Sequence, residues 1–287
     1  MLPSDERMSI MRIAVIPNLR SKGAAALFGP VCDRLTAAGA QVVSVCREGA
    51  LPSAAEIAVT LQGCDAAVAI GGDGTIVHVA KASAAICPVL GVNGGHLGFL
   101  AGLEGDELSG LDALLSQAYT WEDRDLLQIT VHTDGEEREF LAMNEAVISR
   151  GALSRLLDLH VSADGSDLLT TRGDGAIIAT PTGSTAYSMS AGGPVVHPAV
   201  SCMLVTPVCP HSLVSRTHIL PISATLTVTA AAADGGKAFL TVDGEENVSF
   251  GAKDSITVTR AGQTARLIRL KAATYYDVLT EKLSGRR

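Results

Sequence analysis

Residues 65–75 read DAAVAIGGDGT, and this stretch decides the fold class of the chain. It begins with a short apolar run of the kind found in strands that are buried on both faces of a sheet. A glycine-rich turn follows at once, and helical spacing begins at Thr75. A strand that passes through such a turn into a helix is the repeating unit of parallel sheets covered by helices.

The same alternation extends to both sides of this stretch. Further apolar runs, also expected to be buried on both faces, occupy residues 12–17, 41–46 and 88–93. Ala- and Leu-rich helical spacing lies between the runs, near residues 24–38, 53–62 and 75–84. The pattern predicts an α/β N-terminal domain over residues 11–120, with a parallel, Rossmann-like sheet.

After Trp121 the apolar pattern changes to short alternating segments separated by Asp-Gly turns. Asp-Gly between alternating segments is a strong hairpin signal. Residues 138–149 (REFLAMNEAVIS) look like one such segment, interrupted by two polar residues. We expect a β-rich sandwich C-terminal domain over residues 121–271, and a C-terminal helix within 272–287 that completes the first domain.

Composition limits the classes of function. Of the 287 residues, 47% are hydrophobic and 18% charged, which provides for real cores and argues against disorder. The formal net charge of -8 disfavours binding to nucleic acid or to an anionic membrane. Such a charge still permits a small anionic ligand, because a few cations and backbone N–H groups can reverse the field inside one cleft.

The cysteines and the N-terminus favour a cytoplasmic protein. The six cysteines are scattered in apolar surroundings without a C-x-x-C pair, and we expect them to be buried thiols in a reducing compartment. The N-terminal residues carry no basic segment followed by a long apolar core, and no apolar run reaches membrane-spanning length. We predict no metal site formed by protein side chains alone.

The turn Gly71-Gly72-Asp73-Gly74-Thr75 is the first candidate site. Ligands of open parallel sheets bind beyond the carboxyl ends of the strands, where glycines let the backbone approach a phosphate and a helix N-terminus favours an anion. The chain contains no G-x-x-x-x-G-K-[ST] loop. A carboxylate among phosphate-binding groups lowers the affinity for phosphate, so its presence indicates a separate function. Asp73 can accept a proton from a hydroxyl nucleophile or hold Mg²⁺. Alternatively, Asp73-Gly74 is only a turn, like the five other Asp-Gly pairs.

Two further segments are polar where their surroundings are apolar. Asn144-Glu145 is either a bulge at a sheet edge or a ligand grip, since a Glu carboxylate suits a ribose diol and Asn suits an adenine or amide edge. The run from Arg172 to Pro194 is dense in glycines and hydroxyls. It forms either a backbone-lined pocket or a polar loop with a capped helix. Among the histidines, His78 and His96 lie near the candidate cleft.

In combination, these segments resemble the NAD kinase family. The resemblance runs from about Arg12 to Asp277, on GGDGT (71–75), GVNGGHLGFL (91–100), NE (144–145) and RGDGAIIATPTGSTAYSMSAGGPVVHP (172–198). GGDGT is shared with phosphofructokinases and with diacylglycerol and sphingosine kinases, whereas the long run is far more specific. The resemblance implies transfer of a phosphoryl group from ATP, or polyphosphate, to NAD, with a divalent metal such as Mg²⁺, in a homodimer or homotetramer.

The resemblance also implies residue roles. Asp73 is the general base for the 2′-hydroxyl of the adenosine ribose, and Gly71, Gly72, Gly74 and Thr75 form the phosphate-donor loop. The expected NAD-binding residues are Gly74, His78, Asn144, Glu145, Arg155, Arg172, Asp174, Thr185, Ala186, Tyr187, Ser188, Met189, Ser190 and Glu245. Arg172 and Asp174 are expected to line the pocket, and Arg155 and His78 to face phosphates. Glu245 departs from the family, which often has Gln there, so its role stays open.

Two other functions compete with this one. A lipid or sugar kinase of the same superfamily shares GGDGT, but the polar run offers no apolar channel for an acyl chain. A non-catalytic NAD(P) sensor needs no base, and Asp73 within the glycine turn argues against it.

Overall fold

The computed structural model describes residues 10–95, 98–151, 156–212, 215–232, 236–270 and 275–284. The chain divides into two compact units, one made of Met1–Asp123 with Ala265–Arg287 and the other of Arg124–Thr264. It passes from one unit to the other inside strands β6 (Thr120–Thr133) and β17 (Ser255–Arg269). The end of β17 therefore belongs to the first unit, earlier in the chain than the predicted boundary at residue 271.

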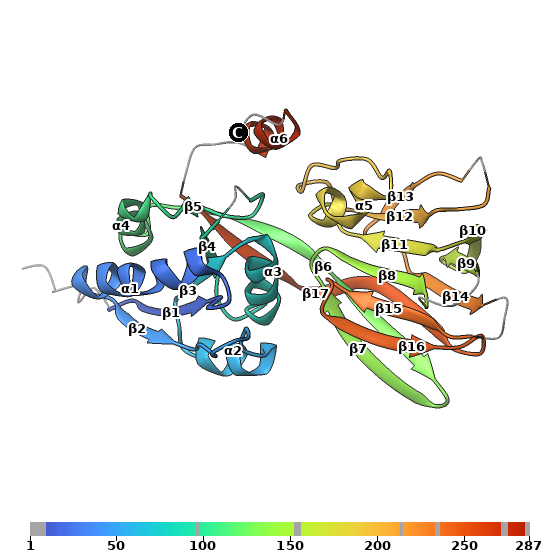
Figure 1. The fold of residues 1–287 in the computed structure, drawn as a ribbon, viewed down its shortest axis with the longest axis horizontal. Coiled ribbons are helices and arrows are strands. Elements are labelled where there is room, and N and C mark those ends of the chain that lie inside the picture. The colour runs from blue at the N-terminus through green and yellow to red at the C-terminus, as the bar shows by residue number, and fades with distance from the viewer. Residues whose placement is uncertain are drawn as a thin grey trace, which may run out of the picture. The chain divides into compact units, whose positions relative to one another are not determined.

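The first unit is built on a parallel sheet. Its strands are β1 (Arg12–Pro17), β2 (Gln41–Ser44), β3 (Ala66–Gly71), β4 (Val89–Asn93) and β5 (Leu103–Glu104). Its helices are α1 (Lys22–Ala37), α2 (Ala54–Leu61), α3 (Asp73–Ala82), η1 (Leu108–Gly110), α4 (Leu111–Leu115) and α6 (Tyr275–Leu283). The order β2-β1-β3-β4 is parallel throughout, which confirms the predicted sheet. Figure 1 shows α1, α2 and α3 packed around these strands.

The burial of the strands follows their position in the sheet. All residues of β3 and β4 are buried, and β1 is buried except at Arg12. The prediction that 41–46 is buried on both faces is wrong, because β2 is the edge strand and its residues are half-buried or exposed. Sequence reasoning also missed β5, and it missed the end of β17, which pairs in parallel with β4 through Leu267 and Val89.

The second unit is a sandwich of antiparallel strands. Its strands between β6 and β17 are β7 (Glu136–Ala142), β8 (Glu145–Arg150), β9 (Leu157–Ala163), β10 (Ser166–Gly173), β11 (Gly175–Ala179), β12 (Cys202–Val208), β13 (His218–Pro221), β14 (Leu226–Ala232), β15 (Ala238–Val242) and β16 (Glu246–Phe250). One sheet has the order β13-β12-β11-β8-β15-β16. The facing strands follow the order β10-β9-β14-β17, and β6 pairs with β17 and β7.

The predicted Asp-Gly turns close hairpins of this unit. Asp134-Gly135 joins β6 to β7 and Asp164-Gly165 joins β9 to β10, with positive φ at all four residues. Asp243-Gly244 lies between β15 and β16 and also has positive φ at both residues. The remaining pair expected in a hairpin turn, Asp234-Gly235, lies outside the described residues. The segment expected as one strand over 138–149 is two strands, because the chain turns at Met143 and Asn144.

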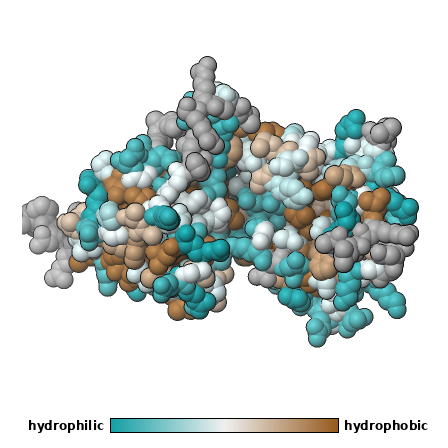
Figure 2. All heavy atoms as spheres, viewed as in Figure 1, coloured by the Kyte–Doolittle hydropathy of each residue, from teal (hydrophilic) through white to brown (hydrophobic). Residues whose placement is uncertain are grey.

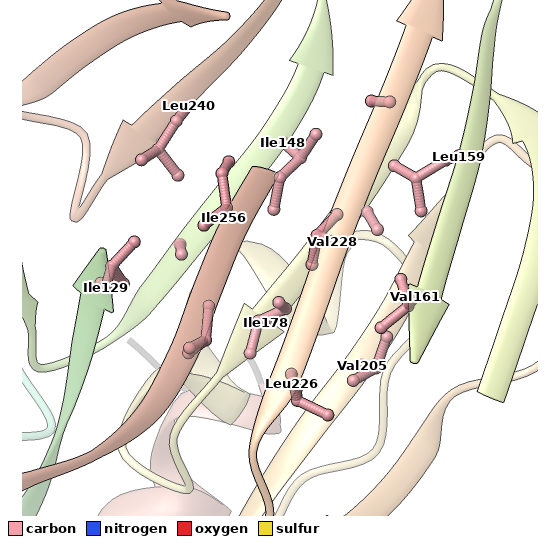
Figure 3. Close-up of a cluster of buried hydrophobic side chains, with 14 of the residues drawn as sticks. Ile129, Ile148, Leu159, Val161, Ile178, Val205, Leu226, Val228, Leu240 and Ile256 are labelled. Atoms are coloured by element: carbon pink, nitrogen blue, oxygen red, sulfur yellow. The ribbon is translucent and has the colours of Figure 1, made fainter. Parts of the chain in front are cut away.

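Aliphatic side chains from both sheets fill the sandwich. Ile148, Ile178 and Val205 come from the sheet that contains β8, β11 and β12, and Val161 and Val228 come from the facing strands. All five are fully buried. Figure 3 shows these side chains meeting between the strands. The core is built without tryptophan or tyrosine, in keeping with an aromatic content of 3%.

The surface mixes polar and apolar residues. Figure 2 shows hydrophilic residues spread over the visible face of each unit, with hydrophobic residues between them. Among the described helices, none combines the length and the apolar character that a membrane span requires. All six cysteines are free thiols, but the prediction that all are buried is wrong for Cys46, exposed in the loop after β2, and for Cys209, exposed directly after β12, and Cys32 is only half-buried.

Candidate functional site

The glycine turn of residues 71–74 joins β3 to α3. The helix begins at Asp73, two residues before the predicted start, with Gly72 as its extended N-cap residue. A Cβ atom on Gly71 would collide with the side chain of Thr75, so only glycine fits there. Thr75 is itself buried, and its hydroxyl oxygen accepts a hydrogen bond from Asn18 Nδ2 at 3.1 Å. A Cβ atom on Gly74 would meet open space.

The Asp73 carboxylate is held in place by backbone N–H groups. Oδ2 accepts the N–H of Phe99 at 2.9 Å, and Oδ1 accepts the N–H of Leu100 at 3.1 Å. A Cβ atom on Gly98 would collide with this carboxylate, which explains the glycine in the LGFL stretch. The Asp73 side chain is 32% exposed. It is therefore neither buried in the core nor turned away into solvent.

The segment that holds Asp73 is fixed from its other side by Arg269. The guanidinium of Arg269 donates to the carbonyl oxygens of Leu100 and Ala101, both at 3.2 Å, and to Glu122 at 3.1 Å. Arg269 comes from the end of β17. Sequence reasoning did not identify it, because nothing in the sequence indicates that β17 runs beside β4 and reaches the segment that follows β4.

His78 projects from α3 toward the loop before α2. Its Nε2 atom lies 2.8 Å from the carbonyl oxygen of Pro52, so the ring donates a hydrogen bond to this oxygen. This hydrogen bond to the Pro52 carbonyl fixes the orientation of the imidazole ring. Its predicted role toward a phosphate stays a prediction, and His96 lies outside the described residues.

In the second unit, the Asp243 carboxylate organises the turn that carries Asn144 and Glu145. Oδ2 of Asp243 accepts the N–H of Met143 at 2.8 Å, and Oδ1 accepts the N–H groups of Asn144 and Glu145, both at 2.9 Å. Thr180 adds a hydrogen bond from its hydroxyl to the Met143 carbonyl at 2.6 Å. Asn144 thus lies in a turn held by hydrogen bonds and Glu145 begins β8, so the polar pair is not a bulge within one strand.

Glu145 is a carboxylate in a largely apolar position. The residue is 7% exposed, and its Oε2 atom is buried without a hydrogen-bond partner among the described residues. The pKa of Glu145 is raised to about 7, mainly by burial and secondly by the charge of Asp243, while a hydrogen bond from the Tyr187 backbone acts in the opposite direction. A buried acceptor without a partner is costly unless a ligand supplies the missing donor.

The hydroxyls of the 180–190 run bind mainly its own backbone. Ser184 donates to the Pro181 carbonyl at 2.6 Å and accepts the N–H of Val196 at 3.0 Å. The hydroxyl of Ser188 lies 2.9 Å from that of Thr206, and both are buried. The short helix α5 (Tyr187–Ser190) exposes Tyr187, at 46%, and Ser190. The run is therefore a stiff loop, held by its own hydrogen bonds, and the hydroxyl of Ser188 is paired with that of Thr206.

A hollow of about 310 Å³ lies in the second unit beside this loop. It is lined by Val147, Ile148, Ser149, Arg150, Gly151, Asp174, Tyr187, Val208 and Cys209. Arg150 Nε donates to Asp174 Oδ1 at 2.6 Å, which fixes the carboxylate on the wall. Sequence reasoning found Asp174 and Tyr187 but missed Arg150.

Arg172 does not line this hollow, and its expected contact with NAD stays a prediction. Its guanidinium forms two hydrogen bonds with Asp158, at 2.7 and 2.8 Å, and both side chains are more than half exposed. The reason is a change of sheet, because β10 ends at Gly173 and β11 begins in the other sheet at Gly175. Arg172 therefore faces the strand partner Asp158, whereas Asp174 faces the hollow.

The remaining predicted residues have less defined surroundings. The side chains of Thr185, Ala186 and Met189 are half-buried. Glu245 follows Asp243-Gly244 in the hairpin and its N–H donates to the Val242 carbonyl at 2.9 Å. Arg155 lies outside the described residues. Within the described part of the chain, no group of three His, Cys, Asp or Glu side chains is arranged to hold a metal ion.

The first unit is a parallel α/β unit that holds a carboxylate in a GGDG turn. The second unit is a sandwich with a buried glutamate beside a stiff, hydroxyl-rich loop. These are the features of a nucleotide-binding phosphotransferase. The ATP-NAD kinase N-terminal domain model matches residues 18–120, and the ATP-NAD kinase C-terminal domain model matches residues 143–270. The chain belongs to the NAD kinase family.

Individual relatives agree with this assignment. The NAD kinase of Symbiobacterium thermophilum is 45% identical over 224 residues, which cover 77% of this chain and 79% of that protein. The NAD kinase of Moorella thermoacetica is 45% identical over 218 residues, or 75% of this chain and 70% of that protein.

Solved structures show the same fold at lower identity. Yeast NADH kinase complexed with NADH has a TM-score of 0.84 at 24% identity, and the match covers 98% of this chain and 89% of that one. An NAD kinase from Archaeoglobus fulgidus in complex with ATP has a TM-score of 0.75 at 24% identity, covering 96% and 100%.

We predict that Asp243→Asn loosens the 143–145 turn. The amide keeps the left-handed backbone conformation but loses the charge that accepts three N–H groups, so the free energy of unfolding should fall by about 2–4 kcal/mol. Urea unfolding measures this change. Asp164→Asn is the matched control, because Asp164 occupies a similar turn but, among the described residues, its side chain accepts only the N–H of Thr225. Equal losses in the two variants would contradict the assigned role of Asp243.

The raised pKa of Glu145 predicts a pH-dependent stability. Between its ordinary pKa of 4.5 and about 7, the folded state holds this proton more tightly than the unfolded state does. The stability that wild type has relative to Glu145→Gln should therefore decrease as the pH rises across this interval, by about 3 kcal/mol in total. Denaturant unfolding at pH 4.5 and pH 7.5 tests this, with Glu136→Gln at an exposed position as the control. A constant difference would show that Glu145 is solvated.

Proposed function

We propose that this protein transfers the terminal phosphoryl group of ATP to the 2′-hydroxyl of the adenosine ribose of NAD, giving NADP. Membership of the NAD kinase family supports the reaction. The observation that carries the mechanism is the Asp73 carboxylate, held by two N–H groups in the glycine turn while one third of it stays exposed.

Asp73 acts as the general base. Each carboxylate oxygen accepts one backbone N–H and retains a second acceptor direction, so the group is oriented without being saturated. A ribose hydroxyl is a poor nucleophile until its proton has an acceptor. As the bond from its oxygen to the terminal phosphorus forms, the proton passes to Asp73 and ADP leaves.

The second unit binds the dinucleotide. Glu145 Oε2 is buried and without a donor, and a ribose hydroxyl provides one. Asn144 stands next to it on the turn fixed by Asp243, and Asp174 and Tyr187 line the neighbouring hollow. We assign Thr185, Ala186, Met189 and Ser190 to contacts from the stiff loop, together with the backbone of Ser188.

The donor binds at the start of α3. The helix N-terminus and the N–H groups around Gly72 and Gly74 suit phosphate oxygens. The described residues provide no ready metal cage, so Mg²⁺ enters with the substrate as MgATP, held by phosphates and water as is usual for this ion. Inorganic polyphosphate presents the same oxygens and is a second candidate donor.

We also propose that the protein assembles as a homodimer or homotetramer, in line with its family, and light scattering on the purified protein tests this.

A lipid or sugar kinase is disfavoured by the family assignment, and a non-catalytic sensor by the oriented base. Offering NAD, diacylglycerol and fructose 6-phosphate with labelled ATP separates these functions. Label recovered in NADP alone supports the proposal, and label in either other product, or in none, contradicts it.

Asp73→Asn should separate binding from chemistry. Without a base, kcat should fall by at least about 10²-fold while KM for NAD stays within about twofold. A coupled enzyme assay that detects NADP as it forms measures both kcat and KM. Asp112→Asn is the control, since Asp112 forms an exposed ion pair with Arg34 in the same unit. Unchanged kcat in Asp73→Asn, with normal folding by circular dichroism, would remove Asp73 from the mechanism.

A further inference from the structure

The C-terminal helix α6 contacts the segment that orients Asp73. The Lys282 ammonium lies 3.8 Å from Asp73 Oδ2 and 4.4 Å from the centre of the Phe99 ring. Tyr275, at the other end of the helix, has its ring centre 6.5 Å from that of Phe99. Two residues of α6 therefore lie against Phe99, whose N–H holds the proposed base.

The ammonium of Lys282 is placed close to Asp73 without being locked to it. The separation of 3.8 Å is longer than a hydrogen bond, and the side chain is 27% exposed. Within the described residues, Lys282 donates no hydrogen bond, and its neighbours are a carboxylate and the face of an aromatic ring. All three donors of the ammonium thus remain available to an incoming anion.

Arg269, a second cation of this region among the described residues, is already occupied. Its guanidinium binds two carbonyl oxygens and the Glu122 carboxylate, so it positions the backbone instead of facing a ligand. Among the described residues, Lys282 is the cation that the structure places in ion-pair contact with Asp73.

We propose that Lys282 is a catalytic residue that binds the phosphoryl group during its transfer and neutralises its charge. The inference rests on the proposed function, because it takes Asp73 to be the base. The nucleophilic oxygen must then lie within about 3 Å of the Asp73 carboxylate and about 3–3.5 Å from the attacked phosphorus. The oxygens of that phosphoryl group fall within reach of a flexible ammonium located 3.8 Å from the same carboxylate.

The chemistry requires a cation at this point. The bond from the ribose oxygen to phosphorus forms as the bond from phosphorus to the ADP oxygen breaks, and the ribose proton passes to Asp73. Negative charge is spread over the phosphoryl oxygens, and catalysis of such transfers comes from positioning of the reactants and from electrostatic stabilisation of this charge. Lysine is a compact point charge suited to this task. The contact with Phe99 keeps the ammonium in place before substrate arrives.

The alternative is that Lys282 only docks α6 on the first unit. A docking role depends on packing, whereas a catalytic role depends on the positive charge. The two are separated by variants that keep or remove the charge, and by supplying the missing cation from solution.

The experiment uses the full-length protein with saturating NAD and MgATP. Lys282→Met should lower kcat by about 10–10²-fold with KM for NAD within about twofold, and Lys282→Arg should recover most of the loss. Added methylammonium should partly restore Lys282→Ala. Lys253→Met, at an exposed turn of the second unit, is the matched control and should leave kcat unchanged.

Two outcomes would overturn the proposal. Wild-type kcat in Lys282→Met excludes a role in the chemical step. Equal losses in the Met and Arg variants, with no methylammonium rescue, show a packing role only. Failure of wild type itself to form NADP would instead contradict the proposed function. Circular dichroism and thermal unfolding confirm that each variant is folded.

Discussion

In the proposed mechanism, the chemistry of the first unit depends on a carboxylate bound by backbone N–H groups. Asp73 begins α3, and the groups that hold it, from Phe99 and Leu100, come from the chain that follows β4, the next strand of the sheet. Because β3 and β4 are adjacent and parallel, their carboxyl ends bring the two segments together. Gly98 is required for the approach, since a Cβ atom would occupy the place of the carboxylate. Positioning thus comes from strand order and one missing side chain.

The second unit uses the same device over a longer chain distance. Asp243 binds three consecutive N–H groups about a hundred residues earlier in the chain and so sets the turn on which Asn144 and Glu145 stand. The negative charge of Asp243 also disfavours ionisation of Glu145, which lies in the same structure. Burying Glu145 next to Asp243 therefore lowers the stability of the folded state. Such an arrangement is usual where a ligand completes the hydrogen bonds.

Local sequence patterns predicted the elements well and the side-chain partners poorly. Apolar runs identified β1, β3 and β4, and Asp-Gly pairs identified the hairpins, because these signals are local. The exposure of β2 was missed because it follows from strand order. The six Asp-Gly pairs look alike in sequence, yet Asp164 accepts one N–H, Asp243 accepts three, and Asp73 starts a helix.

The partners of the arginines were likewise not predictable from local sequence patterns. Their pairing also bears on how a protein of negative net charge binds anionic substrates. Arg34, Arg47, Arg172, Arg260 and Arg266 each pair with a carboxylate, so they contribute little net positive field. With a net charge of -8, long-range attraction of a polyanion is weak. In the proposed mechanism, recognition therefore rests on short-range groups, which are the N–H donors of the glycine turn, the start of α3 and the ammonium of Lys282. Such groups discriminate by geometry, because a diffuse positive surface would attract phosphorylated compounds without regard to their shape.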